Sequence, residues 1–505
     1  MRSLFFLGAV LIVSQFTVSQ TINDLVYLTK NDLSGTARYT SMGGAFGALG
    51  GDLTAIINNP AASSVFLNTE VGASINLQSR LNEGQFFGEF KSTNEDSFHF
   101  DQFGFVFVFN NTDEKNPWSR ISAAINVNRI ANFNQKASLT GNNKKSIADY
   151  FLYYANGIEY QDIQLYSDET ISDVYRYLGD EIGFGAQQAF LGYQSYIIDP
   201  LTADATEKSY ISNITSSNNR NNLDILNSGF HRKTSFNFSG LYKNILHLGV
   251  NFNLHKLDFR NKKDFFEGNQ DLSSFVYDVN FNEDLISFGN GFSFQFGGIL
   301  KIENIRLGAT YDSPQWIDLQ DETQQKISSY RFEDGFAIKE TINPDITNSY
   351  SPYRLKIPSK TTLSFAYIFN LAGLISLDYS TQNFSQTYVS QEGISGFLNT
   401  LNEETNKILN PVNTLKIGGE YRLKNVSLRG GYFYQTKNQG TNENGNQALT
   451  FGIGFDFGGS NLNLSLVKFE QNRDFTVFSK GLTSPYSIKE NLTQFTLSYN
   501  FKLWW

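Results

Sequence analysis

The sequence has 505 residues, of which 18% are charged, and it carries a formal net charge of −9 with no cysteine. The lack of cysteine excludes a disulfide framework, thiol catalysis and cysteine-ligated metals, and an acidic balance without a basic face argues against nucleic acid as a partner. The 46 Phe and 26 Tyr residues, with only 9 prolines, favour long unbroken β-strands.

Residues 1–19 have the three parts of a secretory signal peptide. Arg2 supplies a positive charge, residues 4–13 form an apolar run, and Thr17 to Ser19 place small residues before a cleavage site. The apolar run is too short to cross a bilayer as a helix. We therefore predict export, with cleavage after Ser19.

Residues 20–69 are rich in glycine and other small residues and lack the alternating pattern of a strand. Glycines allow close backbone packing and positive φ angles, and the proline of Asn59-Pro60-Ala61 keeps Asn59 out of helical geometry. We predict a compact plug rather than an ordinary linker. No Lys-Ser follows the glycines, which argues against a phosphate-binding loop. The plug glycines are Gly43, Gly44, Gly47, Gly50 and Gly51.

From about residue 70 onward, apolar and polar residues alternate with a period of two. The final segment is an example, since Phe495, Leu497, Tyr499 and Phe501 share one face of the predicted strand. Most candidate strands have the length that a tilted strand needs to cross a bilayer, and their even number is typical of bacterial barrels. The 14 candidates are 70–79, 98–110, 119–130, 232–242, 245–258, 290–302, 304–312, 359–370, 373–382, 413–423, 425–436, 447–457, 460–470 and 492–504.

The connections between these strands alternate in length, as a membrane barrel requires when short turns lie inside and long loops outside. The predicted inner turns are 110–118, 242–244, 303, 370–372, 424 and 458–459. The predicted outer loops are 80–97, 131–231, 259–289, 313–358, 383–412, 437–446 and 471–491. The sequence therefore predicts an all-β membrane protein in which residues 70–505 form a 14-stranded antiparallel transmembrane barrel that residues 20–69 precede.

The longest outer loop, 131–231, is long enough to have a structure of its own. Residues 146–155 and 167–178 are candidate helices within it. The first of these carries Phe151, Tyr153 and Tyr154.

The face of the strands that points into the lumen mixes apolar and charged residues. Val106, Val108 and Phe433 are apolar, which is expected in a pocket for a hydrophobic ligand and not in a water-filled pore. The charged residues are expected to hold the plug by ion pairs, with a proton- or anion-handling site as the alternative. They are Asp378, Lys416, Glu420, Arg422, Arg429 and Asp456.

The third predicted strand changes character near its outer end. Ile130 falls off the apolar parity after Asn128 and Arg129. Two interpretations remain open at this point: the strand ends at Val127, or a β-bulge shifts the alternation.

The run from Arg38 to Asp52, followed by Asn59-Pro60-Ala61, resembles the N-terminal hatch of the FadL-type outer-membrane transporters for hydrophobic compounds, and its glycine pattern resembles Bacteroidetes members. The resemblance implies that residues 20–69 form an N-terminal hatch in the lumen of the barrel. It also implies passive uptake of small hydrophobic molecules such as long-chain fatty acids, captured by the outer loops, chiefly 131–231 with Phe151, Tyr153 and Tyr154. It also implies that a change around Asn59 to Ala61 releases the ligand. An inward kink of strand three at Asn128, Arg129 and Ile130 would then open a sideways exit through the wall.

Two other functions fit the same pattern: a barrel of this fold that serves as a binding or secretion partner, and a general diffusion porin. We expect no enzyme, because no catalytic cluster can be placed, and no metal, because the four histidines lack ligand spacing. No cofactor is expected, although haem remains open as a ligand. We expect a monomer in the bacterial outer membrane, in contact with lipid. Its C-terminal segment from Phe501 to Trp505 ends in aromatic residues and resembles the signal that the barrel assembly machinery recognises.

Overall fold

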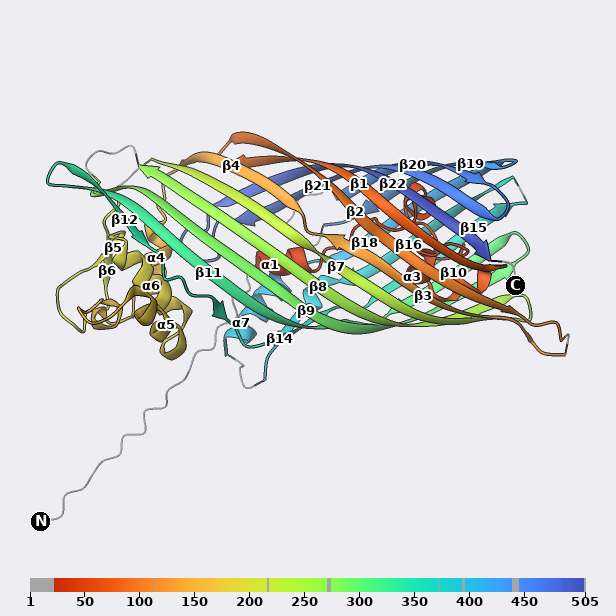
Figure 1. Ribbon diagram of the computed structural model, residues 1–505, viewed down its shortest axis with the longest axis horizontal. Coiled ribbons are helices and arrows are strands. Elements are labelled where there is room, and N and C mark those ends of the chain that lie inside the picture. Colours follow the sequence, from red (N-terminus) through yellow and green to blue (C-terminus); the bar gives the residue numbers. More distant parts are fainter. Residues whose placement is uncertain are drawn as a thin grey trace, which may run out of the picture.

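The computed structural model describes residues 22–113, 115–215, 218–269, 274–370, 372–392, 396–437 and 445–503. These residues form a closed antiparallel barrel of 14 strands, because β1 pairs with β22 as well as with β2. Both the fold class and the strand number predicted from periodicity are confirmed (Figure 1). Three of the 14 positions are each shared by two consecutive strands. The wall consists of β1 (Thr69–Phe86), β2 (Glu89–Asn110), β3 (Trp118–Asn132) with β4 (Gln135–Asn143), β7 (Asn219–Tyr242), β8 (Leu246–Asn269), β9 (Val276–Ile302), β10 (Ile305–Asp312) with β11 (Gln315–Glu333), β14 (Tyr353–Ile357) with β15 (Lys360–Phe369), β16 (Gly373–Asn383), β18 (Pro411–Leu423), β19 (Val426–Gln435), β20 (Asn446–Asp456), β21 (Ser460–Thr476) and β22 (Pro485–Leu503).

All six predicted inner turns are present between these strands. Several contain a residue with positive φ, such as Glu303 at 50° and Lys424 at 53°, which tight hairpin connections require. Within the described residues, no helix is long and apolar enough to span a membrane.

The barrel is much taller on one side than on the other. β7, β8 and β9 have 24, 24 and 27 residues, whereas β19 and β20 have 10 and 11. On β8 the outward side chains are apolar from Leu248 to Leu254 and then change to Lys256 and Arg260. The apolar belt marks the bilayer, so the outer half of the tall wall projects beyond it. An outer loop was expected at 259–289, but paired strands occupy most of it because their inward faces remain buried.

The same correction applies to the first outer loop and to part of the longest one. Residues 80–97 continue the β1–β2 hairpin up to a turn at Phe87 and Gly88, and β4 and β7 occupy both ends of 131–231. Between them lies a helical lobe at the outer end of the barrel, beside β11 and β12 (Phe336–Ile342) (Figure 1). The lobe contains α4 (Ala148–Ala155), α5 (Ile171–Glu181), α6 (Phe184–Gln194), β5 (Ile198–Pro200) and β6 (Tyr210–Ser212). The sequence pattern located α4 and α5 but missed α6, which is buried over most of its length and therefore lacks a polar face.

The N-terminal segment lies inside the barrel as short helices: α1 (Ile22–Leu28), α2 (Ala37–Ser41), α3 (Ala55–Asn58) and the 3-10 helix η1 (Pro60–Val65). A further helix, α7 (Gly396–Ile408), lies in the outer connection between β16 and β18. The predicted signal peptide and the last two tryptophans lie outside the described residues. The structure therefore places the 20–69 segment, from residue 22 onward, where a hatch is expected.

Candidate ligand pocket and hatch

The Asn59-Pro60-Ala61 motif fastens the hatch to itself and to the wall. The Asn59 side chain donates to the carbonyl oxygens of Gly47 at 2.7 Å and of Gly298 on β9 at 3.1 Å, and it accepts from the backbone of Ala61 at 3.0 Å. Pro60 occupies the first position of η1, where its missing N–H leaves no unsatisfied donor. One asparagine thus joins two hatch segments to the barrel.

The hatch approaches the wall so closely that glycine is required on both sides of the contact. A Cβ atom on Gly297 would lie 2.1 Å from Asn59 Oδ1, and one on Gly249 would lie 2.4 Å from the Pro60 backbone. On the hatch side, Gly43 adopts a φ of 62° and Gly47 lies against Ser364 of the wall. The hatch and the wall are therefore matched in shape at the level of the backbone.

Asp378 on β16 is the acceptor for a turn of the hatch. It accepts from the backbone N–H groups of Phe46 at 3.0 Å and Gly47 at 2.9 Å, and from the Asn58 amide at 3.1 Å. Charge-assisted bonds of this kind are about twice as strong as neutral ones. The predicted use of wall charges to hold the plug applies here, although the partners are amides rather than cations.

Glu420 on β18 forms the ionic contact between hatch and wall. It pairs with Arg38 of α2 at 3.0 Å and with the wall residues Arg429 at 2.7 Å and Arg422 at 2.6 Å. Of the charged lumen residues named from the sequence, Asp456 lies apart and pairs with Lys502 near the inner turn. A buried carboxylate that is shared by three guanidinium groups fixes α2 in place.

Strand three bends inward near the residues that the sequence singled out. β2 pairs with β3 only as far as Asn128, and the register with β7 shifts between Arg129 and Ala131. Of the two interpretations left open by the sequence, the structure therefore has the β-bulge, and β3 continues past Val127 to Asn132. Beyond it, β4 passes along the inner side of the β1–β2 hairpin, where Asn82 donates to the Lys136 carbonyl at 2.8 Å.

The hatch covers the backbone of the bent strand. The Asp32 N–H donates to the Ile130 carbonyl at 2.8 Å, the Asn132 N–H donates to the Asp32 carboxylate at 2.8 Å, and Ser34 donates to the Arg129 carbonyl at 2.5 Å. These bonds replace the ladder that β3 loses where it leaves β2. Residues 30–34 of the hatch are thus coupled to the bend of strand three.

A cavity of about 160 Å³ lies in the lumen on the outer side of the hatch. Tyr39, Ile57 and Asn58 of the hatch line it on one side, and wall residues surround it. Apolar side chains line one part of the cavity. They include Leu33, Ile130, Phe384, Val412, Phe433 and Phe469.

Five cations line the same cavity, against two carboxylates. Lys30 pairs with Asp32 at 3.0 Å and Lys360 pairs with Asp312 at 3.3 Å. Lys233 on β7 is buried and donates to the neutral Gln295 amide at 3.1 Å, and no carboxylate in the described part of the chain forms an ion pair with it. Lys416 and Arg473 complete the set. A buried ammonium group with a neutral partner favours an anion.

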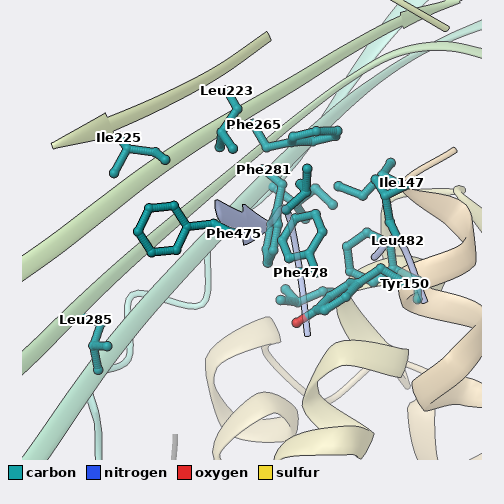
Figure 2. Close-up of a cluster of buried hydrophobic side chains, with 14 of the residues drawn as sticks. Ile147, Tyr150, Leu223, Ile225, Phe265, Phe281, Leu285, Phe475, Phe478 and Leu482 are labelled. Carbon is teal, nitrogen blue, oxygen red and sulfur yellow. The ribbon is translucent and has the colours of Figure 1, made fainter. Parts of the chain in front are cut away.

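A continuous apolar core joins the helical lobe to the outer part of the barrel wall. Figure 2 shows its centre, where Phe478 and Leu482 of the β21–β22 connection meet Tyr150 of α4 and Phe281 of β9. The Tyr150 and Phe478 rings are 4.5 Å apart, in stacking range. Leu25 and Leu28 of α1 belong to the same core, which joins the hatch segment to the lobe.

The structure separates the residues predicted to capture or line the ligand. Phe433 lines the cavity, but Val106 and Val108 pack against the hatch and do not line it. Phe151 is fully buried in the lobe core and Tyr154 packs against Phe184, so only Tyr153 is exposed. Helical periodicity had not shown that the inner face of α4 packs against β9 rather than facing solvent.

Sequence reasoning missed the cations of the cavity, chiefly Lys233, Lys360 and Arg473. A signal for two of them was available, because Lys233 and Lys360 lie near the ends of predicted strands and single charges there alternate with apolar neighbours. What the sequence did not provide was the register that brings these strands around one cavity.

Comparison with solved structures shows the same fold in three bacterial proteins. A FadL homologue of Pseudomonas aeruginosa is 10% identical, with 93% of this chain and 98% of that chain covered and a TM-score of 0.54. The toluene transporter TodX of Pseudomonas putida is 14% identical, with 94% and 99% covered and a TM-score of 0.50. The toluene transporter TbuX of Ralstonia pickettii is 13% identical, with 94% and 99% covered and a TM-score of 0.50.

No family model and no curated protein sequence matches the chain. At these identities the comparison establishes the fold, which extends over nearly the full length of each protein. A closed barrel with an apolar outer belt satisfies every backbone group within a bilayer, as bacterial outer-membrane proteins do. The chain therefore has the fold of the FadL-type outer-membrane channels for hydrophobic compounds, a 14-stranded barrel whose N-terminal segment lies in the lumen.

Proposed function

We propose that this protein takes up hydrophobic molecules across the outer membrane and that its ligand is a long-chain carboxylic acid such as a fatty acid. Lys233 carries this proposal, because it is a buried ammonium group in the lumen cavity whose hydrogen-bond partner is a neutral amide. A ligand carboxylate would supply the missing negative charge. A neutral hydrocarbon gains nothing from such a group.

The apolar side of the cavity accommodates the tail of the same ligand. Phe433 and Phe469 lie with ring centroids 6.0 Å apart on the wall, and Phe384 lies nearby among the lining residues. One polar end and one apolar side are what recognition of an amphiphile requires. Since the hatch lies beneath the cavity, inward passage requires it to move, which favours a gated channel over an open porin.

The bonds between residues 30–34 and strand three connect the cavity to a release step. Asp32 and Ser34 line the cavity and also bond to the strand at Ile130 and Arg129. A ligand that displaces this segment would free the bend of strand three. The sideways exit at Asn128 to Ile130 that the resemblance implies would open in this way.

The test is uptake of radiolabelled palmitate by cells that lack their own transporter, with and without this protein. We expect Lys233→Gln to lower the apparent affinity for palmitate roughly tenfold, the loss of about one charged hydrogen bond. Uptake of the neutral hexadecanol should be unaffected. The matched control is Lys256→Gln, which removes a lysine from the exposed outer face of the neighbouring strand. Uptake should also fall when Asn59 and Pro60 are both replaced by Ala.

Equal loss of palmitate and hexadecanol uptake in Lys233→Gln would contradict the assignment of a carboxylate-binding role. Absence of any palmitate uptake by a folded wild-type barrel would remove fatty acid as the ligand. This result would favour either another hydrophobic ligand or the hypothesis that the protein is a secretion partner.

A further inference from the structure

A second group of cations lies at the opposite end of the lumen, on the inner side of the hatch. Four residues lie near the inner ends of neighbouring strands on one side of the barrel, with β7 between β3 and β8: Arg120 of β3, His247 of β8, Lys301 of β9 and Arg306 of β10. Arg120 pairs with Leu241, Leu241 with His247, and Lys301 directly with Arg306. The register therefore brings residues far apart in sequence to one side of the inner mouth.

Glu303 lies in the turn between Lys301 and Arg306, but among the residues that the structure describes it forms no ion pair with this group. The charged groups that face His247 are Arg306, Arg120 and Lys301. None of these three forms an ion pair within the described ranges, unlike Arg38, Arg422 and Arg429, which share Glu420 across the mouth. Arg306 and Lys301 are directly opposite each other on adjacent strands, where like charges are destabilising. An anion between them would remove that repulsion.

Each of the two arginines donates to a carbonyl oxygen of the hatch, and Arg120 Nε also donates to Asn110 Oδ1 of the wall at 2.8 Å. Arg306 Nη1 donates to the Leu49 carbonyl at 2.5 Å and Arg120 Nη1 donates to the Ser64 carbonyl at 3.0 Å. Ser64 also bonds His247 at 2.8 Å. Arg306 Nε is buried and has no hydrogen-bond partner in the part of the chain that the structure describes, so the guanidinium group retains a donor for a further ligand. A carboxylate is a stronger partner for guanidinium than a carbonyl.

We propose that Arg120, Lys301 and Arg306 form an anion-binding site at the inner mouth that receives the ligand carboxylate on the far side of the hatch. The nature of the ligand rests on the proposed function. Leu49 and Ser64 flank the segment that contains Asn59, so a carboxylate that takes over their guanidinium partners loosens the hatch around this motif. Together with Lys233, this site gives an acid a second route, through the lumen toward the periplasm, beside the sideways exit at strand three. A neutral molecule has no charge for either site to bind.

The first experiment detects the site directly, whether or not transport occurs. A twelve-carbon acid with a diazirine next to its carboxylate is photolysed with the purified, folded protein, and labelled peptides are identified by mass spectrometry. We expect label on peptides that include Leu49, Ser64 or the β9–β10 turn, and its loss in the double variant Lys301→Gln, Arg306→Gln. The control Lys424→Asn changes a cation in another inner turn and suits the positive φ of that position. No label at the inner mouth of the wild-type protein would overturn the site.

The second experiment asks whether the site serves transport. The double variant should take up laurate about tenfold more slowly than wild type, take up neutral dodecanol at the wild-type rate, and retain wild-type laurate affinity in detergent. Equal slowing of both compounds would mean that these residues only hold the hatch, and an unchanged laurate rate would mean that the acid does not pass them. Label at the mouth without any wild-type uptake would overturn the proposed function but leave the anion site standing.

Discussion

The inner half of the molecule, with the hatch in the lumen, and the outer half, with the helical lobe, are joined to the barrel wall by different means. The hatch is joined to the wall by directional polar bonds, such as Asp378 to the amides of Phe46 and Gly47 and Glu420 to Arg38. The lobe and α1 are joined to the tall side of the wall by interlocking rings and aliphatic side chains. Polar bonds can be exchanged for bonds to a ligand or to water. An apolar core, in contrast, can open only if its apolar surface becomes exposed to water.

This difference indicates which half can move during function. The hatch contains glycines at its wall contacts and forms many of its bonds through backbone groups, so a small displacement breaks several bonds together. The lobe core holds Phe151, Phe190 and Leu191 at 0% exposure. We expect the lobe to act as a fixed frame and the hatch to be the moving part.

The largest effect is expected from Glu420→Gln, which removes the ionic contact of the hatch. Breaking one partner of a buried ion pair costs about 3–5 kcal/mol because the other charges stay buried without compensation. Arg38 and Arg429 would be left in that state. Hydrogen exchange followed by mass spectrometry should show a lower opening free energy for the peptides that cover α2 and the hatch glycines.

Peptides of α4 and α6 provide the internal control in this experiment, since they have no contact with Glu420. The control variant is Asp318→Asn, which removes the exposed pair with Arg354 and should change the stability by about 0–1 kcal/mol. Equal loss of protection in the hatch and the lobe would mean that the two halves open as one unit. It would contradict the expectation that the hatch moves while the lobe stays fixed.

A pH-dependent effect is expected in the lobe, at Glu267. This residue lies at the outer end of β8, beyond the apolar belt, and accepts from Ser146 and from the Ile147 N–H at 2.8 Å just before α4. Burial is the main cause that raises its pKa from 4.5 to about 7, against the hydrogen bonds that lower it. The folded lobe therefore binds a proton that the unfolded lobe releases, and its stability is full below about pH 4.5 and is lost as the pH rises through 7.

At 1.36 kcal/mol per pKa unit, the rise from 4.5 to about 7 makes the free energy of unfolding about 3 kcal/mol larger at the acidic limit than at the alkaline limit. Exchange protection of α4 should thus be greater at pH 5 than at pH 8 after correction for intrinsic exchange rates. Glu267→Gln should remove this dependence, since a neutral amide occupies the same place at every pH. A lobe that is more stable at pH 8 would show that Glu267 is ionised in the folded protein.

The fold could be predicted from sequence because a membrane barrel imposes period-two alternation and alternating connection lengths. These signals located all 14 wall positions and all six inner turns. They underestimated strand length on the tall side, because the outward residues of β8 become polar beyond Leu254 while the inward side remains buried. Alternation in hydropathy then no longer distinguishes a strand from a loop.

The site could be predicted only where a single segment carries it. Asn59 to Ala61 form one local motif, and the structure places this motif at the wall contact. The cavity that contains Lys233 and the mouth that contains Arg306 are assembled from strands far apart in sequence. Their residues become neighbours only through the register of the closed barrel, which hydropathy alone does not specify.

A smaller effect, confined to the hatch, is expected from Gly297→Ala. The new Cβ would lie 2.1 Å from Asn59 Oδ1, so the hatch must shift away from β9. Overpacking of this kind costs about 1–3 kcal/mol, and here it falls on the Asn59 bond to Gly298 rather than on any apolar core. We expect faster exchange in the hatch, unchanged exchange in the lobe, and increased ion conductance in a planar bilayer. The matched substitution Gly430→Ala, whose Cβ would have its nearest neighbour at 3.8 Å, should change none of these. If Gly297→Ala left the hatch as protected as in wild type, the contact between Asn59 and the wall would not be what holds the hatch closed.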